Sequence, residues 1–215
     1  MTDACENPWG ALLDASSLPE TTSGLILFFA AAMRSPADAA EAAALLAHRG
    51  FEEPAGLQEA CLAVPLFAGF PRAINVAAAL HRAFPDLPAP PGDDATPEAR
   101  ASRGEELFRR IYADHSDRVL EALATYHPEL PGMILEWAYG RVLSRPSLDG
   151  ATRELMAVAA LTVTGDERQL SSHVRGALRL GSNRKALDAA LALTAPFTSA
   201  TALASALTLV RDLTP

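Results

Sequence analysis

The sequence predicts an all-α protein, and three observations support this fold class. Hydrophobic residues make up 49% of the 215 residues and charged residues only 20%, so the chain has ample apolar material for a buried core. Aromatic residues are scarce at 6%, while alanine runs recur along the chain. Because alanine loses no side-chain entropy on entering a helix, this composition favours helices over strands.

The charge and the N-terminal region predict a cytoplasmic protein. Eighteen basic residues against 26 acidic ones give a net charge of −8, so no basic surface is available to follow a phosphate backbone and nucleic acid is excluded as a partner. The N-terminal residues show no basic segment followed by an apolar run, so no signal peptide is expected. The most apolar early stretch, 24–33, is about half as long as a bilayer requires, so no membrane partner is expected.

A proline-rich segment at residues 85–99 divides the chain. Its prolines and paired aspartates disfavour regular structure and predict an extended linker. It separates an N-terminal tail (1–18) and a first helical part (19–84) from a second part (100–215).

The first part is predicted to contain three alanine-rich helices. Pro36 suits the first turn of the second helix, and Pro65 and Pro71 should break or kink the third. The expected helices cover residues 23–33, 36–47 and 57–81.

The second part begins with three amphipathic helices, expected at residues 98–112, 116–126 and 130–143. Asp149 should then cap a helix at 151–164, which is apolar almost all round and must therefore be central. Gly165 suits a left-handed residue after that helix, and Asp166 suits the cap of the next one. That next helix should end at Gly181, before a last helical stretch (183–212) that is interrupted near Pro196.

The two parts also resemble each other. Residues 59–84 align with residues 189–213, placing Phe67 on Phe197 with the apolar helical pattern in register. This similarity indicates a diverged internal duplication. The first-half position that corresponds to His173 is Ala42.

His173 is the histidine best placed for chemistry. Glu154 precedes it by nineteen residues across the Gly165-Asp166 turn, a spacing that allows an antiparallel helical pair with a Glu–His hydrogen bond. Such a couple supplies a proton donor and acceptor near neutral pH. The alternative is a satisfied core histidine, with Glu154 near a helix N-terminus or paired with Arg153. The other histidines lack metal-site spacing, so no metal is predicted.

Three segments resemble the carboxymuconolactone decarboxylase-like family, which includes the alkylhydroperoxidase D-like proteins. They read YGRVLSRPSLD (139–149), REL (153–155) and QLSSHVRGA (169–177), the last followed by Gly181. The resemblance implies a duplicated alkylhydroperoxidase D-like helical bundle, with 19–84 as a degenerate first repeat and 100–215 as a second repeat carrying the His motif. It also implies self-association as a trimer of pseudo-dimers.

The chain departs from the peroxidase branch of that family. Proteins of that branch have a Cys-x-x-Cys-x-x-x-His pattern on the helix that the 169–177 segment resembles. Here Asp166 and Gln169 stand at the two thiol positions. Peroxide reduction by a dithiol needs both thiols. Cys5 and Cys61 lack the spacing of a redox pair, and Cys61 is expected to be an inert core residue.

The resemblance therefore favours a lyase related to the decarboxylases, acting without a cofactor on a small carboxylated or lactone metabolite. His173 is assigned as proton donor and acceptor, with Glu154 orienting it or sharing the proton. Candidate substrate-binding residues are Arg72, Tyr139, Arg141 and Gln169, with Arg145 as a further carboxylate anchor. The rival hypotheses are a peroxidase-type antioxidant and a non-catalytic helical oligomer that binds a ligand or partner.

Overall fold

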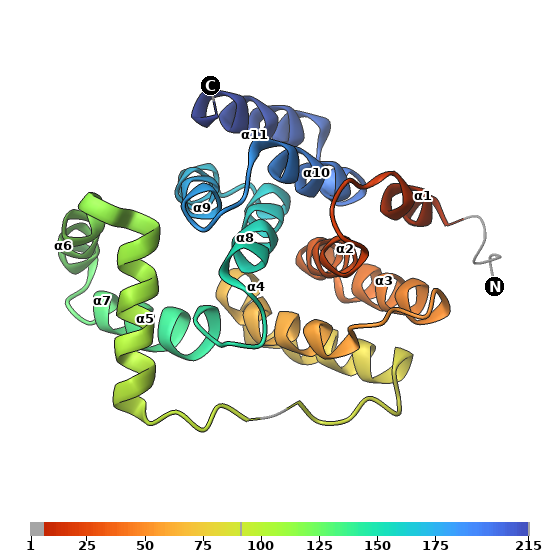
Figure 1. Ribbon diagram of the computed structural model, residues 1–215, viewed down its shortest axis with the longest axis horizontal. Helices are drawn as coiled ribbons and strands as arrows, with labels where there is room; N and C mark the ends of the chain where they lie inside the picture. Colours follow the sequence, from red (N-terminus) through yellow and green to blue (C-terminus); the bar gives the residue numbers. More distant parts are fainter. Residues whose placement is uncertain (1–6, 91, 215) are drawn as a thin grey trace.

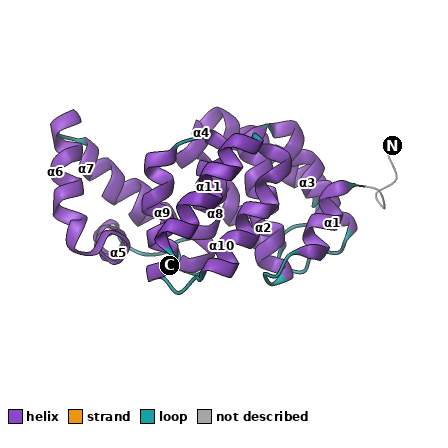
Figure 2. Cartoon of the chain, turned by 90° about the horizontal axis from the view of Figure 1, so that it is seen from above, coloured by secondary structure: helices purple, strands orange, loops and turns teal. Residues whose placement is uncertain are grey.

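The computed structural model describes residues 7–90 and 92–214, and within these ranges all regular secondary structure is helical (Figures 1 and 2). The first half contains α1 (Pro8–Ala15), α2 (Glu20–Arg34), α3 (Pro36–His48) and α4 (Pro54–Ala83). The second half contains α5 (Pro97–Tyr112), η2 (Ala113–His115), α6 (Ser116–Tyr126), α7 (Leu130–Met133), η3 (Ile134–Leu143), α8 (Gly150–Thr164), α9 (Glu167–Arg179), α10 (Arg184–Thr194), η4 (Ala195–Phe197) and α11 (Ala200–Leu213).

Two apolar helices, α2 and α8, form the centre of the molecule. Residues 23–33 of α2 and 152–162 of α8 are all buried, and the two helices pack directly on each other. Figure 1 shows α8 surrounded by α2, α4, α9 and α10. A helix that is hydrophobic on every side needs such a position, because each face left in water would lose the free energy gained by burying apolar surface. The predicted central helix is thus confirmed.

Two predicted caps define the ends of α8. Asp149 accepts a hydrogen bond from the Thr152 backbone N–H at 3.0 Å, and Gly165 is left-handed with φ of 83°. Asp166 differs from its prediction, because its side chain makes no capping bond to α9. Its carboxylate instead accepts a hydrogen bond from the Thr164 hydroxyl at 2.6 Å. Asp166 therefore stabilises the turn between α8 and α9 and does not cap α9.

The kink that Pro65 and Pro71 predict in α4 is present and lies between them, at Gly69. This glycine has φ of 77° and ψ of 165°. Pro71 prevents regular helix before it, and Gly69 supplies a left-handed conformation that a residue with a Cβ would adopt at a cost. The kink lets the two halves of α4 run in different directions.

By length and composition alone, α4 could cross a membrane, and it is the one such helix within the described residues. A third of its most apolar window is buried inside the protein. Core helices pass the same test of length and hydropathy, and α4 carries Glu59, which is 3% exposed and paired with two arginines. These contacts are those of a helix that packs within a globular fold.

Three boundaries differ from the predictions. The expected N-terminal tail contains α1, which begins at Pro8 after an Asn7 cap and buries Trp9 against Phe197, with ring centroids 4.9 Å apart. Cys5 lies outside the described residues. The linker ends before α5, because Thr96 caps that helix and Pro97 fills its first turn. The helix expected at 130–143 is a short α-helix followed by a π-helix, η3.

A buried ionic cluster joins the two halves. Arg145 donates two hydrogen bonds to one oxygen of Glu59, at 2.8 and 3.1 Å, and a third to the other at 2.9 Å; Arg153 donates to Glu59 at 3.1 Å. The side chains of Glu59 and Arg153 are only 4% and 3% exposed. Burial alone would raise the pKa of Glu59, but hydrogen bonds from Arg145, Ser147 and Arg153 outweigh it and lower that pKa. Arg153 is therefore engaged by Glu59 rather than by Glu154.

We predict that Glu59→Ala destabilises the fold by about 3–5 kcal/mol, because it leaves two buried or partly buried guanidinium groups without their carboxylate. Glu105→Ala is the matched control, since it removes only a half-exposed pair with Arg109 worth about 0–1 kcal/mol. Urea denaturation measures both variants. Because the folded-state pKa of Glu59 is lowered, its contribution is present above the unfolded-state pKa and is lost as pH falls through the folded-state value. Equal losses in the two variants would contradict the role of the cluster.

Candidate active site

The helical pair α8 and α9 brings Glu154 and His173 together. The two helices are joined by the tight turn at Gly165, so Glu154 in the first turns of α8 lies opposite His173 in α9. The His173 Nδ1 atom lies 2.9 Å from Oε2 of Glu154. Glu154 is 2% exposed and His173 is 9% exposed. The structure therefore contains the contact that the nineteen-residue spacing allowed.

Gly176 makes room for the carboxylate. A Cβ atom at this position would lie 2.4 Å from Oε2 of Glu154 and 3.1 Å from a methyl carbon of Ile111. Glycine is therefore needed at position 176 for the Glu154 carboxylate to pack against the α9 backbone. Gly176 belongs to the 169–177 segment, for which only His173 and Gln169 had predicted roles; a glycine inside an amphipathic helix was the available signal.

The pair fixes the chemistry of the imidazole. Burial alone would lower the pKa of His173, but the negative charge of Glu154 and its hydrogen bond outweigh that effect and raise the pKa above its ordinary value. With Nδ1 directed at the carboxylate, the neutral ring carries its proton on Nδ1 and presents Nε2 as the nitrogen able to exchange a proton with a ligand.

Aromatic residues from three other elements surround the pair. Phe67, just before the α4 kink, packs against the His173 ring with centroids 6.2 Å apart. Tyr139 of η3 and Tyr112 of α5 both interact electrostatically with Glu154. Burial raises the pKa of each tyrosine, so both hydroxyls remain protonated at neutral pH. The first half contributes Phe67, and the second half contributes the polar groups.

Of the predicted substrate-binding residues within the described ranges, Tyr139 is the one whose pKa the charge of Glu154 raises. The Arg72 guanidinium donates to the Ala32 and Met33 carbonyl oxygens, at 3.0 and 2.8 Å, near the end of α2. Arg141 and Gln169 are exposed. Arg145 pairs with Glu59. Binding of substrate by these residues remains a prediction.

The thiol that could support peroxide chemistry is shielded. Cys61 is 8% exposed, and burial raises its pKa to about 12. A thiol with that pKa is almost fully protonated at neutral pH, and the thiolate is the nucleophilic form. The structure thus agrees with the interpretation of Cys61 as an inert core residue.

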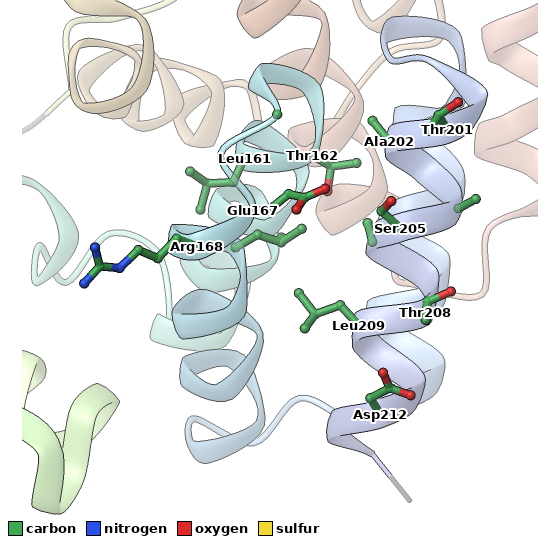
Figure 3. A pocket seen from close by; sticks show the side chains of 14 residues that line it. Leu161, Thr162, Glu167, Arg168, Thr201, Ala202, Ser205, Thr208, Leu209 and Asp212 are labelled. Carbon is green, nitrogen blue, oxygen red and sulfur yellow. The ribbon is translucent and has the colours of Figure 1, made fainter.

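A large groove lies elsewhere. It has a volume of about 780 Å³ and runs between α11 and the turn that joins α8 to α9 (Figure 3). Leu161 and Leu170 line one side, and Ser205 and Leu209 of α11 line the other. His173 and Glu154 are not among its lining residues. The groove therefore gives no access to the pair in the single chain.

Comparisons with known proteins match a family model to the second half and identify relatives of the chain. A sequence model described as "Carboxymuconolactone decarboxylase family" matches residues 128–212. A 4-carboxymuconolactone decarboxylase from Acinetobacter baylyi is 32% identical over 91 residues, covering 42% of this chain and 68% of that protein. Peroxisomal protein 2 from Schizosaccharomyces pombe is 31% identical over 135 residues, covering 60% of this chain and 62% of that protein.

An uncharacterized 15.0 kDa protein from Paracoccus denitrificans is 36% identical over 87 residues, covering 38% of this chain and 63% of that protein. The chain thus spans about two thirds of the length of each of these relatives. Its matched region contains η3, α8 and α9, the elements that supply Tyr139, Glu154 and His173.

We predict that Gly176→Ala destabilises the fold by about 1–3 kcal/mol, because the new methyl group overlaps the Glu154 carboxylate. Gly132→Ala is the matched control, since its Cβ would meet no atom within 4 Å in helix α7. Alanine is the better helix former, so that control should keep or raise stability. Thermal or urea denaturation measures both, and equal stability of Gly176→Ala and wild type would refute the close contact.

We predict that the imidazole of His173 titrates above an ordinary histidine in the wild type and below it in Glu154→Gln, where burial acts without the opposing charge. Proton NMR of the ring resonances measures the midpoint, with free imidazole in the same buffer as the reference. Because the folded-state pKa is raised, the pair stabilises the fold below the unfolded-state pKa and loses this contribution as pH rises through the folded-state value. An unchanged midpoint in Glu154→Gln would show that the two groups are uncoupled.

Proposed function

The chain belongs to the carboxymuconolactone decarboxylase family, and from that premise we propose that it is a lyase that performs acid–base chemistry on a small carboxylated or lactone metabolite without a cofactor. The observation that carries this proposal is the buried Glu154–His173 hydrogen bond. It supplies a proton donor whose second nitrogen is directed away from its partner.

The proposed reaction is loss of a carboxylate from an unsaturated lactone. The C–C bond to the carboxylate breaks, and CO₂ leaves without the bonding electrons. That electron pair moves into the conjugated lactone carbonyl and forms a dienolate oxygen. A proton from Nε2 of His173 then adds to the dienolate carbon, and His173 regains a proton from water. Because the substrate accepts its own electrons, the site needs to hold it, stabilise the oxygen and deliver one proton.

We further propose that the fold is a duplicated alkylhydroperoxidase D-like bundle with one site per chain. In support, the aligned residues Phe67 and Phe197 have different partners: Phe67 packs on His173, and Phe197 packs on Trp9. Ala42 stands where a second histidine would be, so the first half lacks the acid–base residue.

Self-association as a trimer of pseudo-dimers and a cytoplasmic location are part of the same proposal. Phe70, Ile74 and Met133 are 61%, 67% and 61% exposed, and such exposed apolar side chains favour an association surface.

A second candidate function is a non-catalytic helical oligomer that binds a ligand. The low exposure of His173 and its absence from the lining of the α11 groove favour this alternative. Under it, His173→Ala changes stability or ligand binding, and lactone carboxylates are not turned over.

We predict that the protein decarboxylates 4-carboxymuconolactone and that His173→Ala lowers turnover by about a hundredfold or more, as expected for a general acid–base group. The ultraviolet absorbance change of the lactone measures the rate. His115→Ala, at an exposed position on η2, is the matched control and should keep wild-type turnover.

Circular dichroism and sedimentation establish that each variant is folded and has the wild-type assembly state. Turnover that survives His173→Ala would overturn the residue assignment, while absence of wild-type turnover would remove this substrate and favour the second candidate.

A further inference from the structure

In each half of the proposed duplication, the central helix packs against the last helix of that half. Helices α2 and α8 are both 15 residues long, and each is followed by a helix of 13 residues, α3 or α9. Aligning α2 with α8 end to end places Ala32 on Thr162. The internal alignment of the sequence places Arg72 of α4 on Ala202 of α11. The surroundings of Arg72 are therefore a template for the space beside Ala202.

In the first half, an arginine occupies this space. The Arg72 guanidinium donates hydrogen bonds to the carbonyl oxygens of Ala32 and Met33, at 3.0 and 2.8 Å. Both carbonyls belong to the last turn of α2, where they have no intrahelical partner and form the negative end of the helix dipole. A guanidinium group at this place therefore gains both hydrogen bonds and a favourable charge interaction.

In the second half, the same space is open. Ala202 and Thr162 both line the groove of about 780 Å³ that runs between α11 and the α8–α9 turn (Figure 3). An alanine side chain is too short to reach the end of α8 as Arg72 reaches the end of α2. The Thr198 hydroxyl donates to the Thr162 carbonyl oxygen at 3.0 Å, and that oxygen has a second lone pair for another donor. The groove thus has room for the guanidinium group that its counterpart contains.

Carboxylates add to the negative potential of the groove. Glu167 in the first turn of α9 and Asp212 near the end of α11 both line it. Figure 3 shows the Glu167 side chain directed toward α11, whereas the Arg168 guanidinium extends away from that helix. The end of α8 contributes the negative end of its dipole. A cation is therefore the charged group that this groove favours.

We propose that the groove binds a small molecule that carries a guanidinium group on a short apolar stem. The guanidinium occupies the place that Arg72 fills in the first half, and it donates to the end of α8 and to the carboxylate of Glu167. The stem lies on the apolar lining, which is supplied by Leu161, Leu170 and Leu209. The groove volume is within the range of about 300–1,000 Å³ that is typical of small-molecule sites, which favours a free ligand over a single side chain of a second copy.

The probe is n-butylguanidinium chloride, titrated into the whole chain by isothermal calorimetry, with N-butylurea as its neutral isostere. The charged probe should bind saturably at one site per chain. N-butylurea should bind about tenfold more weakly at the same ionic strength, because it has the same stem and shape without the charge. Glu167→Gln should lower the affinity for the charged probe by about threefold or more, while Glu121→Gln, at an exposed position on α6, should keep it.

Ala202→Arg tests the assignment most directly, because it gives the groove the side chain that its counterpart in the first half has. The affinity for n-butylguanidinium should fall by about tenfold or more, and the melting temperature should equal or exceed that of the wild type. Ala200→Arg is the matched control. It adds the same side chain to the same helix at an exposed position outside the groove lining, and it should change the affinity by less than about threefold.

Absence of probe binding by the wild type, equal affinity for the two probes, or unchanged affinity in Ala202→Arg would overturn this inference. A lowered melting temperature in Ala202→Arg would contradict the correspondence between the two halves, on which the inference rests. Absence of probe binding together with dissociation of the assembly in Ala202→Arg, measured by sedimentation velocity, would identify the groove as an interface between copies. Because Glu154 and His173 do not line the groove, these outcomes are independent of lactone turnover.

Discussion

The Glu154 carboxylate is buried between the apolar helix α8 and the buried face of the amphipathic helix α9, where an unpaired charge would cost several kcal/mol. Its burial requires the imidazole of His173 as partner and the absence of a side chain at Gly176. The charge in turn raises the pKa of His173 against the effect of burial. The packing of α8 on α9, the glycine at position 176 and the pKa of His173 therefore all depend on this one carboxylate.

The second buried carboxylate, Glu59, has a different role. It is surrounded by two arginines from the other half of the chain, and these hold it ionised without leaving a lone pair directed at a ligand. Removing one partner of such an ionic cluster costs several kcal/mol of stability, but the intact cluster stabilises a fold little more than apolar packing would. Its main effect is therefore to fix how the two halves of the chain meet. That registry is what brings Phe67 of the first half to the His173 ring.

Much of the fold could be predicted from residue patterns, because capping and apolar periodicity are local. Asp149, Gly165 and the apolar run between them specified α8 without tertiary information. The missed features depend on packing. Trp9 makes α1 part of the core through Phe197, and the i+5 hydrogen bonding of η3 leaves no mark in hydropathy.

The site was predictable in part. The spacing of Glu154 and His173 allowed their contact, whereas Tyr112 comes from a helix whose position on α9 cannot be deduced from sequence distance. For Arg72, the neighbouring sequence gave no sign that the guanidinium would donate to backbone carbonyl oxygens of α2. Contacts between side chains of helices that are distant in the sequence could be identified only from the structure.

The central claim is that Glu154 and His173 act as one acid–base couple on a substrate. The most direct measurement is the pH dependence of kcat/KM for 4-carboxymuconolactone in the wild type and in Glu154→Gln. The account predicts that activity falls as pH rises through the raised pKa of His173, and that this limb moves to lower pH in Glu154→Gln. A limb at the same pH in both proteins would contradict it.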